Sequence, residues 1–265
     1  MTTDVRYRWS AGDAYERYVG RWSRAVAAEF VSWLGLPANA RCVDVGCGTG
    51  ALGAALLDAG VGEMLGLDRS RGYVTTARAG TGDRRARHAV ADARALPVRA
   101  DRFDAAVSGL VLNFVPHPPR MLAEMVRVVR PGGCVAVYVW DYADKMEPIR
   151  WFWDEAVALD PAAAALDEGP RFPICDRPSL ETLFSAAGLA SVETRAIDVP
   201  AVFADFDDFW APFLSGEGPA PGYSASLDEE RRAALRESLR RRLPAAADGS
   251  IALTARAWAA RGVRA

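Results

Sequence analysis

A glycine-rich run follows a short apolar segment and constrains the fold more than any other part of the chain. The run spans residues 42–50 and reads CVDVGCGTG. This pattern is typical of a buried strand that stops in a loop where a helix begins. Three glycines leave the backbone bare there, so a ligand could lie directly against peptide N–H groups. A second apolar segment, residues 64–67, ends in Asp68. A glycine turn after one strand and a carboxylate after the next favour a nucleoside site at the carboxyl edge of a parallel sheet.

The spacing of the glycines indicates which nucleoside is expected. Dinucleotide enzymes usually show G-x-G-x-x-G, whereas this loop shows Asp44-x-Gly46-x-Gly48-x-Gly50. The pattern resembles motif I of the class I S-adenosylmethionine (SAM) dependent methyltransferases of the UbiE/methyltransferase-11-like type. That resemblance implies SAM as the cofactor and S-adenosylhomocysteine as the product.

Later segments follow in the order expected for that family. Asp92 comes after a third apolar stretch, and residues 103–110 look like a fourth strand. An Arg-Pro-Gly-Gly run at 130–133 then opens a fifth apolar segment, 134–140. The resemblance covers residues 40–140 and becomes looser on both sides. The parts outside this range are expected to determine the acceptor.

The alternation of short apolar runs with helical periods predicts an α/β fold. With the resemblance, we expect a Rossmann-like, seven-stranded, mostly parallel sheet with an antiparallel C-terminal edge strand, helices on both faces and a helical insertion before the last strand. One methyltransferase domain is expected over residues 1–265. It would comprise an N-terminal helical cover (1–35), a cofactor-binding half (36–140) and a substrate-side half (141–265) with an insertion at about 203–249.

The resemblance also implies roles for particular side chains. Asp44 would help to hold the methionine ammonium, Asp68 the ribose hydroxyls and Asp92 the adenine amine, while Arg21 is a candidate partner for the methionine carboxylate. Simpler interpretations stay open: Asp68 could cap the following helix, and Asp92 and Arg21 could be solvated. The predicted cofactor-binding set is Arg21, Asp44, Gly46, Cys47, Gly48, Gly50, Asp68, Arg69, Asp92, Ala93 and Leu110.

Aromatic residues dominate the predicted acceptor site, which suggests a small, partly apolar acceptor. His117 is the candidate general base, although a surface-turn histidine among prolines is the simpler interpretation. The aromatic stripe at 206–213 is either core or a hydrophobic lid. The predicted substrate-binding set is Tyr18, Trp22, Asn113, Trp140, Tyr142 and Trp210.

Composition restricts the partners. A formal net charge of -2 over 265 residues gives no reason to expect a nucleic-acid partner. The four cysteines lack Cys-x-x-Cys spacing, and no His/Cys cluster indicates a metal site. No apolar run is long enough to span a bilayer, and the N-terminus has no apolar signal core. We therefore expect a cytoplasmic monomer or homodimer that acts on a small molecule, away from membranes.

The expected reaction is methyl transfer from SAM to that acceptor by in-line displacement, because the resembled family works in this way. Two alternatives remain. An NAD-type Rossmann dehydrogenase would also have a glycine loop and a distal acid, but it would need a catalytic lysine motif, and Lys145 is the only lysine. A noncatalytic SAM-binding regulator would fit the lack of an evident base.

Overall fold

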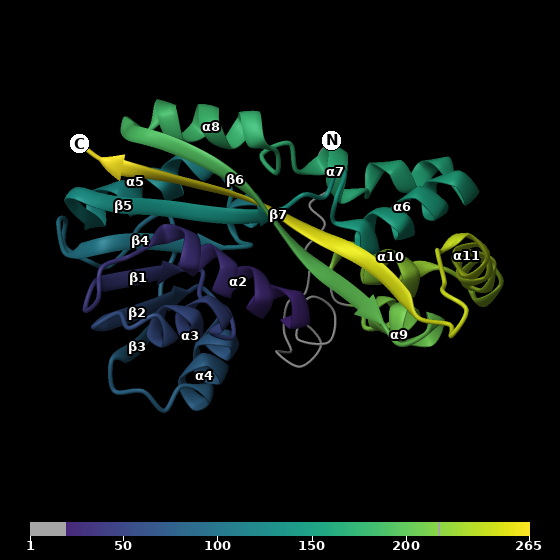
Figure 1. The fold of residues 1–265 in the computed structure, drawn as a ribbon. Helices are drawn as coiled ribbons and strands as arrows, with labels where there is room; N and C mark the ends of the chain where they lie inside the picture. The colour runs from purple at the N-terminus through teal and green to yellow at the C-terminus, as the bar shows by residue number, and fades with distance from the viewer. Residues whose placement is uncertain (1–19, 217) are drawn as a thin grey trace. The chain divides into compact units, whose positions relative to one another are not determined.

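The computed structural model describes residues 20–216 and 218–265, and Figure 1 shows the elements in chain order. Its contacts divide the chain into two compact units. The sheet unit comprises Ser23–Asp141, Pro173–Asp198 and Ala257–Ala265. The helical unit comprises the described residues of Met1–Trp22, Tyr142–Phe172 and Val199–Arg256. Tyr18 lies outside the described residues, and so does the side chain of Arg21.

Within the described residues, seven strands form one sheet in the order β3-β2-β1-β4-β5-β7-β6. Strands β1 to β5 pair in parallel, and β7 pairs antiparallel with β5. The predicted Rossmann-like sheet with an antiparallel end is confirmed; within that end β7 lies second and β6 is outermost. The strands are β1 (Arg41–Val45), β2 (Glu63–Asp68), β3 (Ala86–Val90), β4 (Phe103–Gly109), β5 (Val129–Trp140), β6 (Leu189–Phe203) and β7 (Ile251–Arg264).

The central strands of the sheet are apolar and buried, which is why the apolar runs in the sequence predicted them. Four of the five residues of β1 are buried, and so is the middle of β4, as expected for parallel strands covered on both faces. Local capping then sets where helices begin; Ser70, for example, accepts from the backbone N–H of Tyr73 at the start of α4. The helices beside these strands are α2 (Arg21–Leu34), α3 (Ala51–Asp58), α4 (Arg71–Gly80), α5 (Pro118–Val128) and α8 (Arg177–Ala186), with a short 3-10 turn η2 (Leu112–Phe114).

The helical unit has its own aromatic core. The rings of Phe152 and Phe213 stack with centroids 4.5 Å apart, and Phe209 packs 5.4 Å from Phe213. The helices between β6 and β7 confirm the expected helical insertion. This unit contains α6 (Glu147–Leu159), η3 (Pro161–Ala165), α7 (Glu168–Arg171), α9 (Phe206–Trp210), η4 (Ala211–Leu214), α10 (Pro219–Ser226) and α11 (Glu229–Arg242). Over the described ranges, every helix is too short or too polar to cross a membrane.

Candidate cofactor and acceptor site

In the loop between β1 and α3, Gly46 is packed against a neighbouring side chain, whereas Gly48 faces open space. Gly46, Gly48 and Gly50 all have positive φ values, 80°, 51° and 102°, a region that glycine adopts without strain. The backbone N–H of Gly46 donates to the Leu67 carbonyl over 2.6 Å, which holds the loop over the end of β2. A Cβ at Gly46 would lie 2.5 Å from a Val111 methyl, whereas a Cβ at Gly48 would meet nothing within 4 Å. Backbone at Gly48 is therefore accessible to a ligand.

Asp68 ends β2 directly beside this loop. Its Oδ2 accepts from the N–H of Gly48 over 3.0 Å, and its Oδ1 accepts from the N–H of Ser70 over 2.7 Å. Burial raises the pKa of Asp68, and these two N–H donors oppose that rise. A carboxylate has about four acceptor positions, so two remain for the hydroxyls of a ribose. Asp68 thus shapes the loop and keeps capacity for a ligand.

Asp44 is a fully buried carboxyl in β1. Neither of its oxygens has a hydrogen-bond partner among the described residues. Burial raises the pKa of Asp44 to about 8, and the nearby Asp68 adds to the rise; the backbone N–H of Gly53, which does not reach hydrogen-bond geometry, opposes it. A buried carboxyl without a partner is unfavourable unless a donor reaches it. The methionine ammonium of SAM would be such a donor, so this position fits the expected cofactor.

Asp92 lies after β3 and is held by an arginine that the sequence analysis missed. Its Oδ2 lies 2.7 Å from Nη2 of Arg94, and its Oδ1 accepts from the Arg94 backbone N–H over 2.8 Å. The side-chain hydrogen bond from Arg94 lowers the pKa of Asp92 to about 2. Asp92 is therefore ionised at neutral pH. Its neighbour Ala93 is half-buried, and Arg69, next to Asp68, is exposed.

The chain leaving β4 supplies the acceptor side of the sheet unit. Leu110 is buried with φ 61°, and its N–H donates to the Tyr138 carbonyl over 2.8 Å. In η2, Nδ2 of Asn113 is buried and has no acceptor among the described residues. His117 is exposed at the start of α5, as the surface-turn interpretation expects, and its catalytic role stays a prediction. Trp140 is buried at the end of β5.

The carboxyl ends of parallel strands meet at one edge of a sheet. The sheet unit therefore brings together, at the ends of β1 to β5, the larger part of the predicted set. These residues are Asp44, Gly46, Cys47, Gly48, Gly50, Asp68, Arg69, Asp92, Ala93, Leu110, Asn113, His117 and Trp140.

Three other predicted acceptor residues belong to the helical unit, where each is buried against an aromatic ring. Ring centroids are 5.7 Å apart for Trp22 and Phe203, 5.6 Å for Tyr142 and Phe172, and 6.1 Å for Trp210 and Phe213. These contacts describe core packing. A role in holding the acceptor stays a prediction for Trp22, Tyr142 and Trp210.

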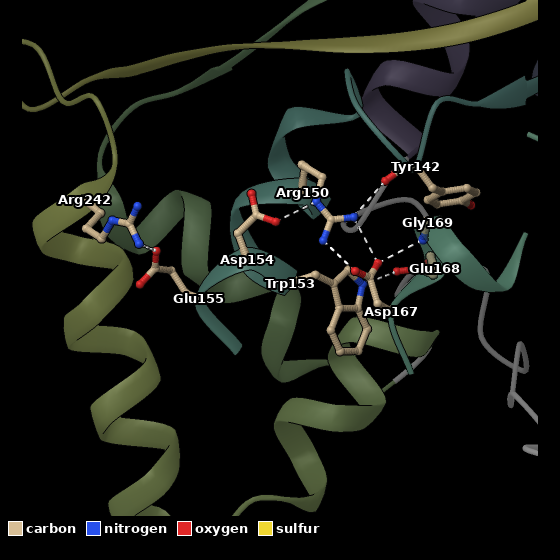
Figure 2. Close-up of polar contacts among 9 residues, drawn as sticks. All are labelled: Tyr142, Arg150, Trp153, Asp154, Glu155, Asp167, Glu168, Gly169 and Arg242. Carbon is tan, nitrogen blue, oxygen red and sulfur yellow. Dashed lines mark hydrogen bonds and ion pairs between the residues drawn. The ribbon is translucent and has the colours of Figure 1, made fainter. Parts of the chain in front are cut away.

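Figure 2 shows a polar network in the helical unit that sequence patterns did not indicate. Arg150 donates to both carboxylate oxygens of Asp167, over 3.0 and 2.7 Å, and to the backbone carbonyl of Tyr142 over 3.1 Å. Nearby, Nε1 of Trp153 donates to Glu168 over 2.8 Å. Burial raises the pKa of Glu168 to about 8. The network fixes the chain that leaves β5, and its partners lie too far apart in sequence for a local signal.

The family model and the relatives that match this chain are all methyltransferases. A family model described as a methyltransferase domain matches residues 43–137. A demethylmenaquinone methyltransferase of Clavibacter sepedonicus is 34% identical over 171 residues, which cover 60% of this chain and 69% of that protein. The tRNA (carboxymethyluridine(34)-5-O)-methyltransferase ALKBH8 of Mus musculus is 35% identical over 122 residues. That match covers 45% of this chain but spans only 17% of the length of the mouse protein.

A solved structure supports the fold. The phosphoethanolamine N-methyltransferase 2 of Haemonchus contortus, in complex with phosphomonomethylethanolamine and S-adenosylhomocysteine, superposes with a TM-score of 0.57 at 16% identity. The superposition covers 96% of this chain and 56% of that one. At this identity, the likeness concerns the fold alone.

Proposed function

The chain belongs to the class I SAM-dependent methyltransferase family, and from this membership we propose that it transfers the methyl group of SAM to a small, partly apolar acceptor. The observation that carries the proposal is the buried Asp44, whose oxygens lack a partner directly beside the open glycine loop. A cation bound beside this carboxyl would favour its ionised form and lower its raised pKa. The match to methyltransferases leaves the alternative of an NAD-type dehydrogenase without support.

In the proposed complex, residues of the sheet unit contact the ammonium, the methionine chain, the ribose and the adenine of the cofactor. Asp44 pairs with the ammonium, the backbone around Gly48 lies against the methionine part, and Asp68 accepts from the ribose hydroxyls. Asp92 accepts from the adenine amine beside Ala93. Charge-assisted hydrogen bonds of this type contribute about 1.5–3 kcal/mol each. When bound, SAM supplies a methyl group on a positively charged sulfur.

The acceptor would lie against the chain that leaves β4. Leu110 provides an apolar contact, and the unpaired Nδ2 of Asn113 would donate to an oxygen of the acceptor. An acceptor without such an oxygen would leave this amide buried and unsatisfied, which costs about 1–3 kcal/mol. These residues act by orienting the acceptor, and orientation alone can lower a barrier by roughly 7–11 kcal/mol.

The choice of a small acceptor over nucleic acid has two supports. One relative is named for demethylmenaquinone, which is a quinone and not a nucleic acid, although another is named for tRNA. The net charge of -2 disfavours binding to a phosphate backbone, which depends on lysine and arginine contacts. The location of the protein is a separate proposal. We propose that it is cytoplasmic, because all four cysteines are free thiols, as is usual in reducing compartments.

Formation of S-adenosylhomocysteine tests the proposal. The protein would be incubated with SAM and, separately, a reduced naphthoquinone, a small aromatic amine and bulk tRNA. We expect product with at least one small acceptor, and less product after Asn113→Ala. Product that depends on tRNA alone would contradict the small-molecule proposal. Absence of product with every acceptor, together with measurable SAM binding, would favour the noncatalytic regulator.

A further inference from the structure

The helical unit has a cavity, open to solvent, that none of the proposed cofactor or acceptor residues lines. Its volume is about 330 Å³, and its walls come from α6, α10 and α11 together with the turn between the last two. Small-molecule sites generally measure about 300–1,000 Å³. All lining residues belong to the helical unit. The cavity is therefore large enough for a small ligand.

The walls of the cavity are mainly apolar. Leu235 is 1% exposed at its base, whereas Leu159 is 51% exposed at its mouth. Leu227 and Ala234 complete the apolar lining. A ligand that covered Leu159 would remove a large exposed hydrophobic side chain from water, which is favourable. The apolar body of a ligand would accordingly lie between these side chains.

Three polar groups lie at the same cavity: Tyr223, Asp160 and Arg231. Burial and the charge of Asp160 raise the pKa of Tyr223, whereas Arg231 lowers it, so the phenol lies within the field of both charges. Asp160 already accepts from the backbone N–H of Ala162 over 3.0 Å. Arg231 makes an exposed ion pair with Asp228 at 3.6 Å. The guanidinium nitrogens outside this long pair can donate to an anionic group of a ligand, and the protonated hydroxyl of Tyr223 is a second donor at the same cavity.

The helices that form the walls are held together on another side. Glu155 of α6 accepts from the hydroxyl of Ser238 over 2.6 Å and pairs with Arg242 at 2.5 Å, both on α11. Figure 2 shows the pair with Arg242. The ring of Tyr223 packs 5.6 Å from that of Trp153. A cavity whose walls are fixed in this way loses little conformational freedom when it binds a ligand.

We propose that this cavity binds a small amphipathic anion, with an apolar body of about two fused rings and one carboxylate or sulfonate. The apolar body contacts Leu159, Leu227 and Leu235. The anionic group pairs with Arg231 and accepts from the hydroxyl of Tyr223. None of its lining residues belongs to the proposed cofactor site, so this proposal does not depend on the proposed function.

Calorimetric titration with 8-anilinonaphthalene-1-sulfonate tests the proposal, because this probe has both parts of the expected ligand. We expect one site in the unaltered protein. Ala234→Phe should fill the cavity and weaken binding at least tenfold, while Ala233→Phe, an exposed neighbour outside the lining, should change it less than twofold. Arg231→Gln should weaken binding several-fold and reduce its salt dependence, whereas Arg241→Gln, exposed on the same helix, should not.

A further variant keeps the test independent of folding defects. Leu159→Glu changes a half-exposed position, so the fold should tolerate it, and it places a like charge at the mouth of the cavity. We expect it to weaken binding at least tenfold while binding of S-adenosylhomocysteine is unchanged. Failure of the unaltered protein to bind the probe would overturn the proposal. Equal weakening by the two phenylalanine variants, or no effect of Leu159→Glu, would do the same.

Discussion

Gly46 occupies a position where backbone angle and neighbouring side chains both require glycine. Its φ is 80°, and a Cβ would lie within 2.9 Å of three Val111 carbons. We expect Gly46→Ala to destabilise the fold by about 1–3 kcal/mol, because the left-handed region and the contact are both unfavourable for alanine. Affinity for S-adenosylhomocysteine should fall at least tenfold. Denaturant unfolding and calorimetry measure the two effects.

Gly80→Ala is the matched control for this substitution. Gly80 ends α4, and a Cβ there would meet nothing within 4 Å. Alanine at this position should leave affinity unchanged and alter stability by less than about 1 kcal/mol. If Gly46→Ala behaved in the same way as the control, the close approach of Val111 would not shape the loop.

Glu168 links the stability of the helical unit to pH. Burial raises its pKa from 4.5 to about 8. Between these values the folded protein keeps a proton that the unfolded chain has lost, so the free energy of unfolding falls as pH rises through this window. Glu168→Gln should flatten that fall and stabilise the protein at pH 9 by roughly 2 kcal/mol or more, since one pKa unit corresponds to about 1.4 kcal/mol.

Urea unfolding at pH 5, 7 and 9 measures this effect. Asp44 contributes in the same direction, because burial raises its pKa to about 8, so part of the slope should remain in the Glu168→Gln variant. The glutamine can still accept from Nε1 of Trp153. A slope identical to that of the unaltered protein would contradict the assignment of Glu168 as a neutral buried carboxyl.

At the residue scale, the sequence predicted the site positions that follow from the order of strands and loops along the chain. Asp44, Gly48 and Asp68 lie together because a strand end and its loop are contiguous, and the neighbouring parallel strand ends at the same edge. Arg94 was missed, although it lies two residues after Asp92. Its role depends on a side-chain direction that spacing alone did not indicate.

At the element scale, parallel strands were predictable because burial on both faces makes them continuous apolar runs. The outermost position of β6 could not be predicted in the same way. The order of the last two strands depends on which of them pairs with β5, and in this sheet that strand is β7. In β6 the outer strand alternates between buried and exposed residues over its second half. The position of an antiparallel strand therefore needs tertiary information.

Arg150 of α6 connects segments that are distant in sequence. Its side chain is 16% exposed and pairs with Asp167, which is 10% exposed. Arg150→Met would leave the carboxylate of Asp167 largely buried and without its main partner. We expect a loss of about 3 kcal/mol in the free energy of unfolding, as is typical when one member of a buried pair is removed. Denaturant titration followed by tryptophan fluorescence measures the loss.

Arg177→Met provides the control. Arg177 also pairs with a carboxylate, Glu181, over 2.8 Å, but both side chains are exposed. Exposed pairs on one helix contribute little to stability, so this variant should unfold close to the unaltered protein. Comparable losses in the two variants would contradict a special role for the network around Arg150.

At the scale of the whole molecule, motif order predicted the sheet unit far better than the helical unit. Motifs in the sheet unit lie in one continuous stretch, whereas the helical unit is assembled mainly from 142–172 and 199–256. Its core depends on contacts such as Phe152 with Phe213, which are 61 positions apart in the sequence. A periodic pattern can indicate that such a residue is buried, but not what it packs against. The expectation of one domain over 1–265 stays a prediction.

Calorimetric titration with S-adenosylhomocysteine tests the central claim most directly. The unaltered protein should bind one equivalent, and Asp68→Ala should weaken binding at least about tenfold, because the hydrogen bonds to the ribose are charge-assisted. Asp83→Ala, which removes a partly exposed carboxylate paired with Arg85, should bind as the unaltered protein does. Absence of binding, or equal affinity in the Asp68→Ala variant, would contradict a cofactor site at the ends of β1 and β2.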